Sequence, residues 1–261
     1  MYANCASSCH ACDSTTRCVW DGADTTLGVP AGSLHTFIER ASSDEFRARP
    51  EVLSEDPLVL QLDGFLAADE VAALVELSRG LPWSQSQVLQ KRMAGAGADA
   101  AYRKSAHRDS QNTFCDAQCY ESVPARTLLD RARELTLLPP EHTEMQFVRY
   151  DPGQYYRTHH DYLGGSDAYL AGPRTLTLFV YLTDVAAGGE TAFPALNLTV
   201  VPRAGRALLW TSTLDDEPLV KDVRTKHAAL PVGEGGHKLA VNVWYYHRDF
   251  WKARNLGCVG G

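Results

Sequence analysis

Three side chains in the second half of the chain have types and positions that suit a metal ion. His159 and Asp161 stand two residues apart in RYDPGQYYRTHHDYL, so on a strand they share a face while His160 points away. His227, in TKHAALP, follows after several β-like segments. Two imidazoles and one carboxylate form the facial triad of non-haem Fe(II) sites, which leaves coordination positions open. Zinc sites usually close at four ligands, and Mg or Ca prefers oxygen, so the pattern predicts a redox-active iron centre.

A lysine lies on an otherwise largely apolar strand further along. Alternation in GGHKLAVNVWYYH places Lys238, Ala240, Asn242 and Trp244 on one face. A buried ammonium group is costly without a partner, and a cosubstrate with carboxylates would supply one. The alternative is an edge-strand lysine whose tip reaches solvent.

The segments that must position these side chains are mostly β. From residue 144, short β-branched and aromatic runs are separated by Pro and Gly turns: EMQFVRY, RTLTLFVYL, LTVVP, RALLW and HKLAVNVWYY. With helices confined to the N-terminal side, this order predicts an α+β, mainly β chain. Its core would be a double-stranded β-helix (jelly roll) flanked by N-terminal helices.

The N-terminal half carries helix signals. A strand over PLVLQLDGFL, with Leu58, Leu60 and Leu62 on one face, precedes a helix over ADEVAALVELSRG that ends near Gly80. A second helix is expected from Ser122 to about residue 138, and a weak one after a Ser33 cap. The polar stretch 84–118 between the two main helices is expected to be a functional or mobile loop.

The seven cysteines suggest an oxidising compartment. Four crowd into the first 18 positions: Cys5, Cys9, Cys12 and Cys18. NCASSCHAC resembles the second half of a six-cysteine ShK-type module, which implies disulfides; a zinc site with His10 is the alternative. Cys115 and Cys119 are close enough in sequence to pair, and the odd Cys258 would be free or intermolecular.

Composition excludes several classes of protein. The 261 residues carry a formal charge of −7, with 44% hydrophobic and 22% charged residues, which is typical of a globular chain and unfavourable for nucleic-acid binding. No run approaches the roughly 18 to 20 apolar residues of a membrane span. The first residues lack a signal peptide, so we expect Met1 to lie within a longer precursor.

From about residue 57 to 250 the chain resembles the prolyl 4-hydroxylase family of 2-oxoglutarate and Fe(II)-dependent dioxygenases. RYDPGQYYRTHHDY, RTLTLFVYLTDVAAGGETAFP, VVPRAGRALLW, KHAALPV and HKLAVNVW occur in that family's order and at close to its spacing. The resemblance implies roles by position. Iron would be bound by His159, Asp161 and His227. The 2-oxoglutarate pocket would contain Lys238, Tyr150, Thr191 and Trp244. Peptide substrate would contact Tyr156 and Arg174. The other histidines are expected to be surface or structural residues: His10, His35, His107, His142, His160, His237 and His247.

Two departures from the family pattern bear on substrate choice. The interval from His227 to Lys238 is one residue longer than usual, and Tyr246 stands where the family commonly has a histidine. The expected organisation is a Cys-rich segment at 1–18, a linker at 19–56, the dioxygenase domain at 57–252 and a tail at 253–261.

The resemblance implies hydroxylation of peptidyl proline with Fe(II), 2-oxoglutarate, O2 and L-ascorbate, releasing succinate and CO2. The partner would be a Pro-rich or hydroxyproline-rich polypeptide, which in its extended form fits a groove beside the iron, with 84–112 and 163–173 as lids. The cysteines and the sequon at Asn197 favour the endoplasmic reticulum or secretory pathway. Two alternatives remain open: a 2-oxoglutarate oxygenase acting on a non-proline substrate, and a non-catalytic β-barrel binding module.

Overall fold

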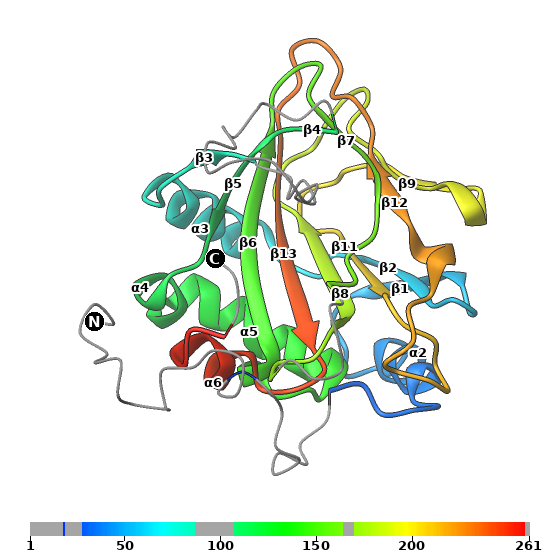
Figure 1. Cartoon of the computed structure of the whole chain (residues 1–261). Helices are drawn as coiled ribbons and strands as arrows, with labels where there is room; N and C mark the ends of the chain where they lie inside the picture. Colours follow the sequence, from blue (N-terminus) through cyan, green and yellow to red (C-terminus); the bar gives the residue numbers. More distant parts are fainter. Residues whose placement is uncertain (1–17, 19–27, 87–106, 164–169, 259–261) are drawn as a thin grey trace, which may run out of the picture.

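The computed structural model describes residues 18, 28–86, 107–163 and 170–258, which form two antiparallel β-sheets with helices against one of them (Figure 1). The large sheet has the order β1 (Arg49–Ser54), β2 (Val59–Asp63), β11 (Ala207–Thr211), β8 (Arg174–Tyr181), β13 (Lys238–Tyr246), β6 (Thr143–Tyr150), β5 (Gln111–Phe114) and β3 (Ser84–Gln85). The small sheet has the order β10 (Leu198–Val200), β9 (Thr191–Phe193), β12 (His227–Ala229), β7 (Tyr155–His159) and β4 (Arg108–Asp109). The predicted mainly β jelly-roll architecture is confirmed.

Alternation along β13 separates the two faces of the large sheet. Val241 and Val243 belong to the main apolar core, which also contains the buried residues of the helices. Lys238, Asn242 and Trp244 line a cavity on the opposite face. The sheet is therefore a rigid floor, with helices behind it and the cavity in front.

Three helices match the predicted ones: α2 (Leu34–Ala41), α3 (Ala68–Arg79) and α5 (Val123–Thr136). Two more, α4 (Ala117–Glu121) and α6 (Phe250–Asn255), were not predicted. The described 3-10 turns are η2 (Pro140–His142), η3 (Pro194–Leu196) and η4 (Val223–Thr225). Gly80 is the C-cap of α3, and Ser122 caps α5 by accepting from the Ala125 amide. Arg131 of α5 pairs with both carboxylate oxygens of Glu70 on α3, at 2.7 and 2.9 Å, and ties the two helices together.

The predicted strand is present as β2, and its two faces are buried because Leu60 and Leu62 pack into the main apolar core while Val59 packs into a second apolar cluster. Two other expectations for the N-terminal region need correction. The described part of the expected linker is folded: α2 packs into the core, and β1 pairs with β2, so the domain begins well before residue 57. Ser33 does occupy the N-cap position of α2, but its hydroxyl donates to the Pro30 carbonyl, and Asp215 accepts the Leu34 N–H instead.

The C-terminal end is also part of the folded unit. Helix α6 runs past residue 252 and buries Ala253, so 253–258 is not a free tail. Cys258 forms an intramolecular disulfide with Cys18, 240 positions away, instead of being free or intermolecular. Cys18 is thereby unavailable to a zinc site, while the other three N-terminal cysteines and His10 lie outside the described residues. A second disulfide joins Cys115 and Cys119.

Within the described ranges, no helix has the length and apolar character needed to cross a membrane. The outer parts of the 84–118 stretch form β3, β4 and β5, whereas 87–106 and 164–169, the centres of the two expected lids, lie outside the described residues.

Candidate metal centre

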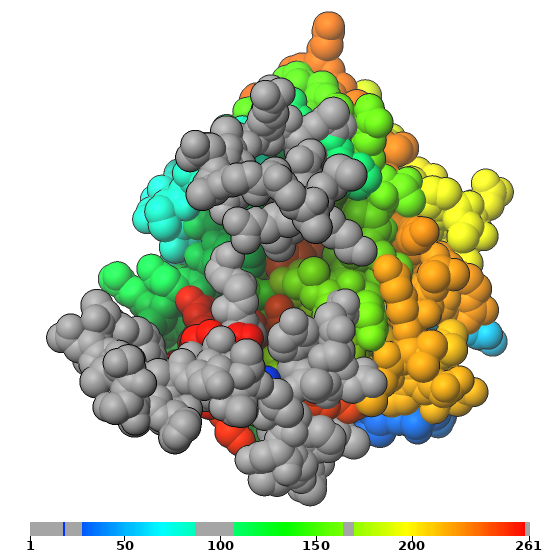
Figure 2. All heavy atoms as spheres, in the orientation of Figure 1, coloured from blue at the N-terminus to red at the C-terminus, as the bar shows by residue number. Residues whose placement is uncertain are grey.

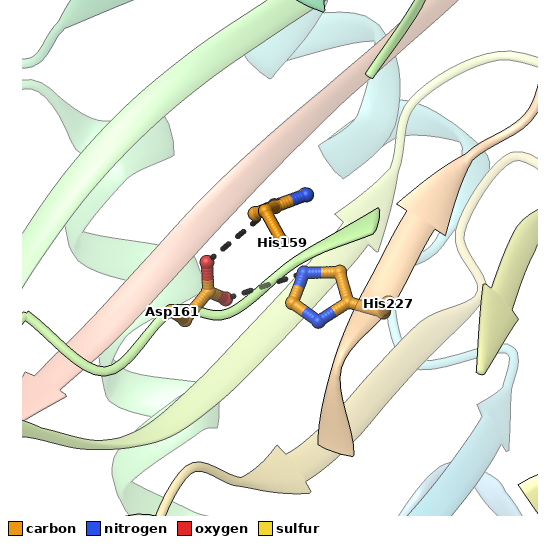
Figure 3. A group of neighbouring side chains, drawn as sticks. All are labelled: His159, Asp161 and His227. Carbon is orange, nitrogen blue, oxygen red and sulfur yellow. Dashed lines mark ion pairs between the residues drawn. The ribbon is translucent and has the colours of Figure 1, made fainter. Parts of the chain in front are cut away.

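The three predicted metal ligands converge where β7 and β12 lie side by side. His159 is the last residue of β7 and His227 the first of β12, and the antiparallel register places them directly opposite each other. Asp161 follows two residues after His159, and its carboxylate faces both rings, with one oxygen directed toward each (Figure 3). The Nε2 atoms of His159 and His227 lie 3.8 and 3.7 Å from the carboxylate oxygens, and one ligand atom from each residue falls within 4.8 Å of the others.

Backbone carbonyls fix both imidazoles in the form that binds metals. His159 Nδ1 lies 2.9 Å from the Arg157 carbonyl, and His227 Nδ1 lies 3.0 Å from the Thr225 carbonyl. A carbonyl can only accept a hydrogen bond, so each Nδ1 carries the proton and each Nε2 keeps its lone pair. Burial, reinforced by the neighbouring His227, lowers the pKa of His159 well below its ordinary value, which keeps the ring neutral. These residues therefore fit an Fe(II) ion.

The carboxylate of the triad stays ionised although it is buried. Burial raises the pKa of Asp161, but His227, His159, Arg174 and the Thr177 hydroxyl together outweigh burial and lower the pKa to about 2. The Thr177 hydroxyl, on β8, donates to Asp161 Oδ2 over 2.8 Å. This contact orients the carboxylate and links it to the sheet floor, a role for Thr177 that the sequence pattern did not reveal.

Lys238 is a buried cation whose anionic partner is not found among the described residues. The side chain is 1% exposed, and Nζ donates to the Gly189 carbonyl at 2.7 Å, with no carboxylate of the described chain within ion-pair distance. Burial lowers the pKa of Lys238 from 10.5 to about 7, partly opposed by Glu190. Such a lysine fits the distal carboxylate of 2-oxoglutarate, because that anion would supply the missing charge and acceptors.

Lys238 and the metal ligands are linked through residues on one face of β8. Nζ lies over the rings of Phe179, Tyr181 and Tyr150, 5.3 to 5.4 Å from each ring centre, so the lysine side chain leans along the sheet. Phe179 stands two residues from Thr177, the donor to Asp161, which corresponds to about 7 Å along a strand. The residue beside the lysine and the residue that contacts Asp161 are therefore neighbours on the same face of β8.

Two other predicted pocket residues lie beside Lys238. Tyr150 is its direct partner across β6 and β13, and burial raises the pKa of Tyr150, so its hydroxyl stays protonated and able to donate. Thr191 is buried on β9 and lines the same cavity. Its hydroxyl accepts from Tyr181 at 2.7 Å and keeps its own proton available for a ligand. The sequence analysis did not predict a role for Tyr181. Its position on the same strand face as Thr177 and Phe179 was the only indication that it would lie near the site.

The remaining predicted residues line the metal end of the cavity. Trp244 lies six residues from Lys238, about 20 Å along the strand, and pairs with Thr177. It therefore lies at the opposite end from the lysine. The Arg174 guanidinium stacks on Trp244 at 3.6 Å and pairs with Glu144 at 2.5 Å. Tyr156 stacks on His159 with ring centres 3.4 Å apart.

One cavity of about 770 Å³ joins both ends of the site. It runs from Lys238 past the triad to Glu144, Arg174 and Trp244. Figure 2 shows the face of the molecule in front of the sheet floor, with the yellow to orange residues of β9 to β12 on one side and the cyan to green residues of β3 to β5 on the other. The volume accommodates a small cosubstrate together with part of a second molecule.

The fold and the site define a class. Residues 145–246 match the 2OG-Fe(II) oxygenase superfamily, a range that contains all three metal ligands and Lys238. The chain belongs to the prolyl 4-hydroxylase-like 2-oxoglutarate and Fe(II)-dependent oxygenases.

Individual relatives narrow that class. Probable prolyl 4-hydroxylase 3 of Arabidopsis thaliana is 30% identical over 221 residues, which cover 77% of this chain and 73% of the relative. Probable prolyl 4-hydroxylase 7 of the same plant is 30% identical over 251 residues, covering 87% and 76%. Among solved structures, the viral collagen prolyl hydroxylase vCPH from Paramecium Bursaria Chlorella virus-1, in its 2OG complex, is similar with a TM-score of 0.54 and 25% identity, over 72% of this chain and 94% of that one.

Proposed function

We propose that the protein hydroxylates proline residues in polypeptides, using Fe(II), 2-oxoglutarate and O2 and releasing succinate and CO2. The observation that carries the proposal is that one cavity contains the His-Asp-His triad and a buried lysine with no carboxylate partner among the described residues. Relatives named prolyl 4-hydroxylases, similar over most of the chain, support the choice of proline.

Each residue of the site has a role that follows from its contacts. His159, Asp161 and His227 would hold Fe(II), which when bound supplies the O2 activation that couples cosubstrate oxidation to C–H hydroxylation. Lys238 would bind the distal carboxylate of 2-oxoglutarate, with Tyr150 and Thr191 donating hydroxyl hydrogen bonds beside it. The rings around Lys238 exclude water, which strengthens these contacts.

Substrate would enter from the metal end of the cavity. Trp244 and Tyr156 contribute aromatic surface there, with Arg174 stacked on one and His159 on the other, and Arg174 and Glu144 form a polar wall beside them. Because Arg174 is already paired with Glu144, we infer that this wall meets a neutral backbone rather than an acidic side chain. A Pro-rich or hydroxyproline-rich segment is extended before binding and loses little entropy there.

We further propose that L-ascorbate maintains the iron in its reduced state, and that the protein works in the endoplasmic reticulum or a later secretory compartment. Two disulfides and an exposed sequon asparagine, Asn197, support the location, because disulfides persist in oxidising compartments. Fractionation with a tagged chain tests the location, and a reductant series tests the ascorbate requirement.

The central experiment is turnover with a Pro-rich peptide panel. Succinate release is measured together with mass-spectrometric localisation of the added oxygen, for the unmodified protein, for His159→Ala and for His35→Ala, an exposed histidine on α2. We expect oxygen on proline with the unmodified protein and His35→Ala, and none with His159→Ala.

Other outcomes separate the competing functions. Peptide-dependent succinate release with the added oxygen on a residue other than proline would show that the protein is a 2-oxoglutarate oxygenase with a non-proline substrate. A folded protein that binds 2-oxoglutarate and gives no product with any peptide would favour the non-catalytic module.

A further inference from the structure

His160 stands between two metal ligands but points away from them. Its Nδ1 accepts the Tyr162 backbone N–H at 2.9 Å, so the ring proton is on Nε2. Nε2 in turn donates to the Asp222 carbonyl at 2.6 Å. Both ring nitrogens are therefore engaged with backbone groups, which excludes His160 as a fourth ligand and ties it to a distant turn.

That turn, residues 222–225, orients the third metal ligand. It forms η4, and the Thr225 carbonyl at its end accepts from His227 Nδ1 at 3.0 Å. The Thr225 hydroxyl donates to the Asp222 carbonyl at 3.1 Å and lies 3.2 Å from His160 Nε2. His160 thus contacts both the first residue of the turn and the residue that holds the His227 ring.

On its outer side the turn is held by charged residues. The Asp222 carboxylate, whose side chain is 2% exposed, pairs with Arg224, which also pairs with Asp56. The Arg224 and Asp56 side chains are 40% and 78% exposed, so the pair between these two contributes little, typically about 0 to 1 kcal/mol. On its inner side the same residue, Asp222, is held by the part-buried hydrogen bond from His160.

We propose that His160 is a positioning residue for the metal centre. The two-residue alternation sends His159 and Asp161 to the metal and His160 to the 222–225 turn, so one short segment sets both halves of the triad. Through Asp222 and Thr225, the His160 imidazole fixes the His227 ring relative to the His159–Asp161 pair. The inference concerns metal affinity and so rests on the metal site of the proposed function, not on the identity of the substrate.

Two substitutions at His160 test its contact with the Asp222 carbonyl separately from its contact with the Tyr162 N–H. Gln places an amide N–H about as far from the backbone as Nε2, so His160→Gln can still reach Asp222. Asn places its oxygen near the Nδ1 position, so His160→Asn can still accept the Tyr162 N–H. Its side chain is too short to donate to the Asp222 carbonyl in the turn. Loss of a group hydrogen-bonded directly to a metal ligand typically weakens metal binding about 10- to 100-fold, and His160 acts one contact further out, so the lower end of that range, about 10-fold, is expected.

The test measures Co(II) affinity by chelator competition, together with the visible spectrum of bound Co(II), without any turnover. We expect His160→Asn to bind Co(II) about 10-fold more weakly with altered bands, and His160→Gln to stay within about threefold of the unmodified protein. His35→Asn, on an exposed helix face, is the matched control and should change nothing.

Unchanged affinity in His160→Asn, or equal losses in His160→Asn and His160→Gln, would overturn the proposal. Thr225→Val removes the hydroxyl contact and leaves the carbonyl, so it tests the route even if His160→Asn does not fold. If the double variant His160→Asn/Thr225→Val loses as much binding free energy as the two single variants together, His160 does not act on His227 through Thr225. Normal Co(II) binding with no turnover on any peptide would instead leave His160 in its role and reject the proposed function.

Discussion

Lys238 is a buried charge without a carboxylate partner in the described part of the chain, and it gives a prediction that separates stability from function. Replacing Lys238 by Met keeps a long flexible side chain in the cavity wall and removes the ammonium group. We expect the ligand-free variant to be more stable than the unmodified protein at pH 6 and unable to bind 2-oxoglutarate.

The magnitude follows from the pKa of the lysine. The interval from the ordinary pKa of 10.5 to about 7 in the folded protein corresponds, at about 1.4 kcal/mol per pKa unit, to at most about 5 kcal/mol. The group is fully buried, so solvent does not screen this effect. Since replacing buried charges by apolar side chains has gained about 1 to 4 kcal/mol elsewhere, we expect a gain of a few kcal/mol.

The pH dependence has a definite sign. Below pH 7 both the folded and the unfolded chain keep the lysine proton, and the folded state carries the full penalty. Between pH 7 and 10.5 the unfolded chain binds more protons, so this group makes stability rise with pH by at most about 1.4 kcal/mol per pH unit. The advantage of Lys238→Met should therefore shrink as pH rises from 7 towards 10.

The assay is guanidinium unfolding at pH 6, 8 and 9.5, with and without 2-oxoglutarate and Mn(II). Ligand at 100 times its dissociation constant should stabilise the unmodified protein by about 2.7 kcal/mol and leave Lys238→Met unchanged. Lys252→Met, at an exposed position of α6, is the control for added hydrophobicity. A Lys238→Met variant that is less stable at pH 6, or that keeps the stabilisation by 2-oxoglutarate, would refute the reasoning.

Two further substitutions test the metal centre and a close backbone contact. Thr177→Val preserves shape and removes the donor to Asp161; we expect Co(II) affinity to fall about 10- to 100-fold, and an unchanged affinity in chelator competition would show that the hydroxyl does not orient the carboxylate. Gly188 has a φ of +73°, and an added Cβ would lie 2.2 Å from the Pro231 carbonyl oxygen, so Gly188→Ala should lower the free energy of unfolding by more than about 2 kcal/mol. Gly32→Ala has a similar φ of +70° with open space around it and should cost only about 1 kcal/mol in the same guanidinium titration; equal losses would mean that the Gly188 contact is not tight in solution.

The regular elements near the site were largely predictable. Along β13, strict alternation puts Lys238 and Trp244 on the cavity face and Val241 on the helix face, because a strand has a period of two. The α5 cap at Ser122 was equally readable, since its partner lies three residues away. Both features depend only on residues close together in the sequence, so the local backbone geometry is enough to predict them.

Expectations failed where the partner is distant in sequence. The N–H of Leu34 is accepted by Asp215, 181 positions away, and no local pattern around Ser33 indicates that. Cys258 pairs with Cys18 for the same reason. The strand β1 within the expected linker is ordered by pairing with β2, because its own residues are exposed or only half-buried and would not form a strand alone.

The sequence by itself determined the chemistry available to this protein: two histidines, an aspartate and a lysine on β-like segments, with strand alternation deciding that His160 could not face the same way as its neighbours. Only the tertiary structure decided that His227 lies opposite His159, that Thr177 orients Asp161, and that Lys238 has aromatic rings around it and no counter-charge among the described residues. The physical reason is that register and burial are set by contacts between strands far apart in the chain. Those contacts bring the residues of the site close enough to act as one centre.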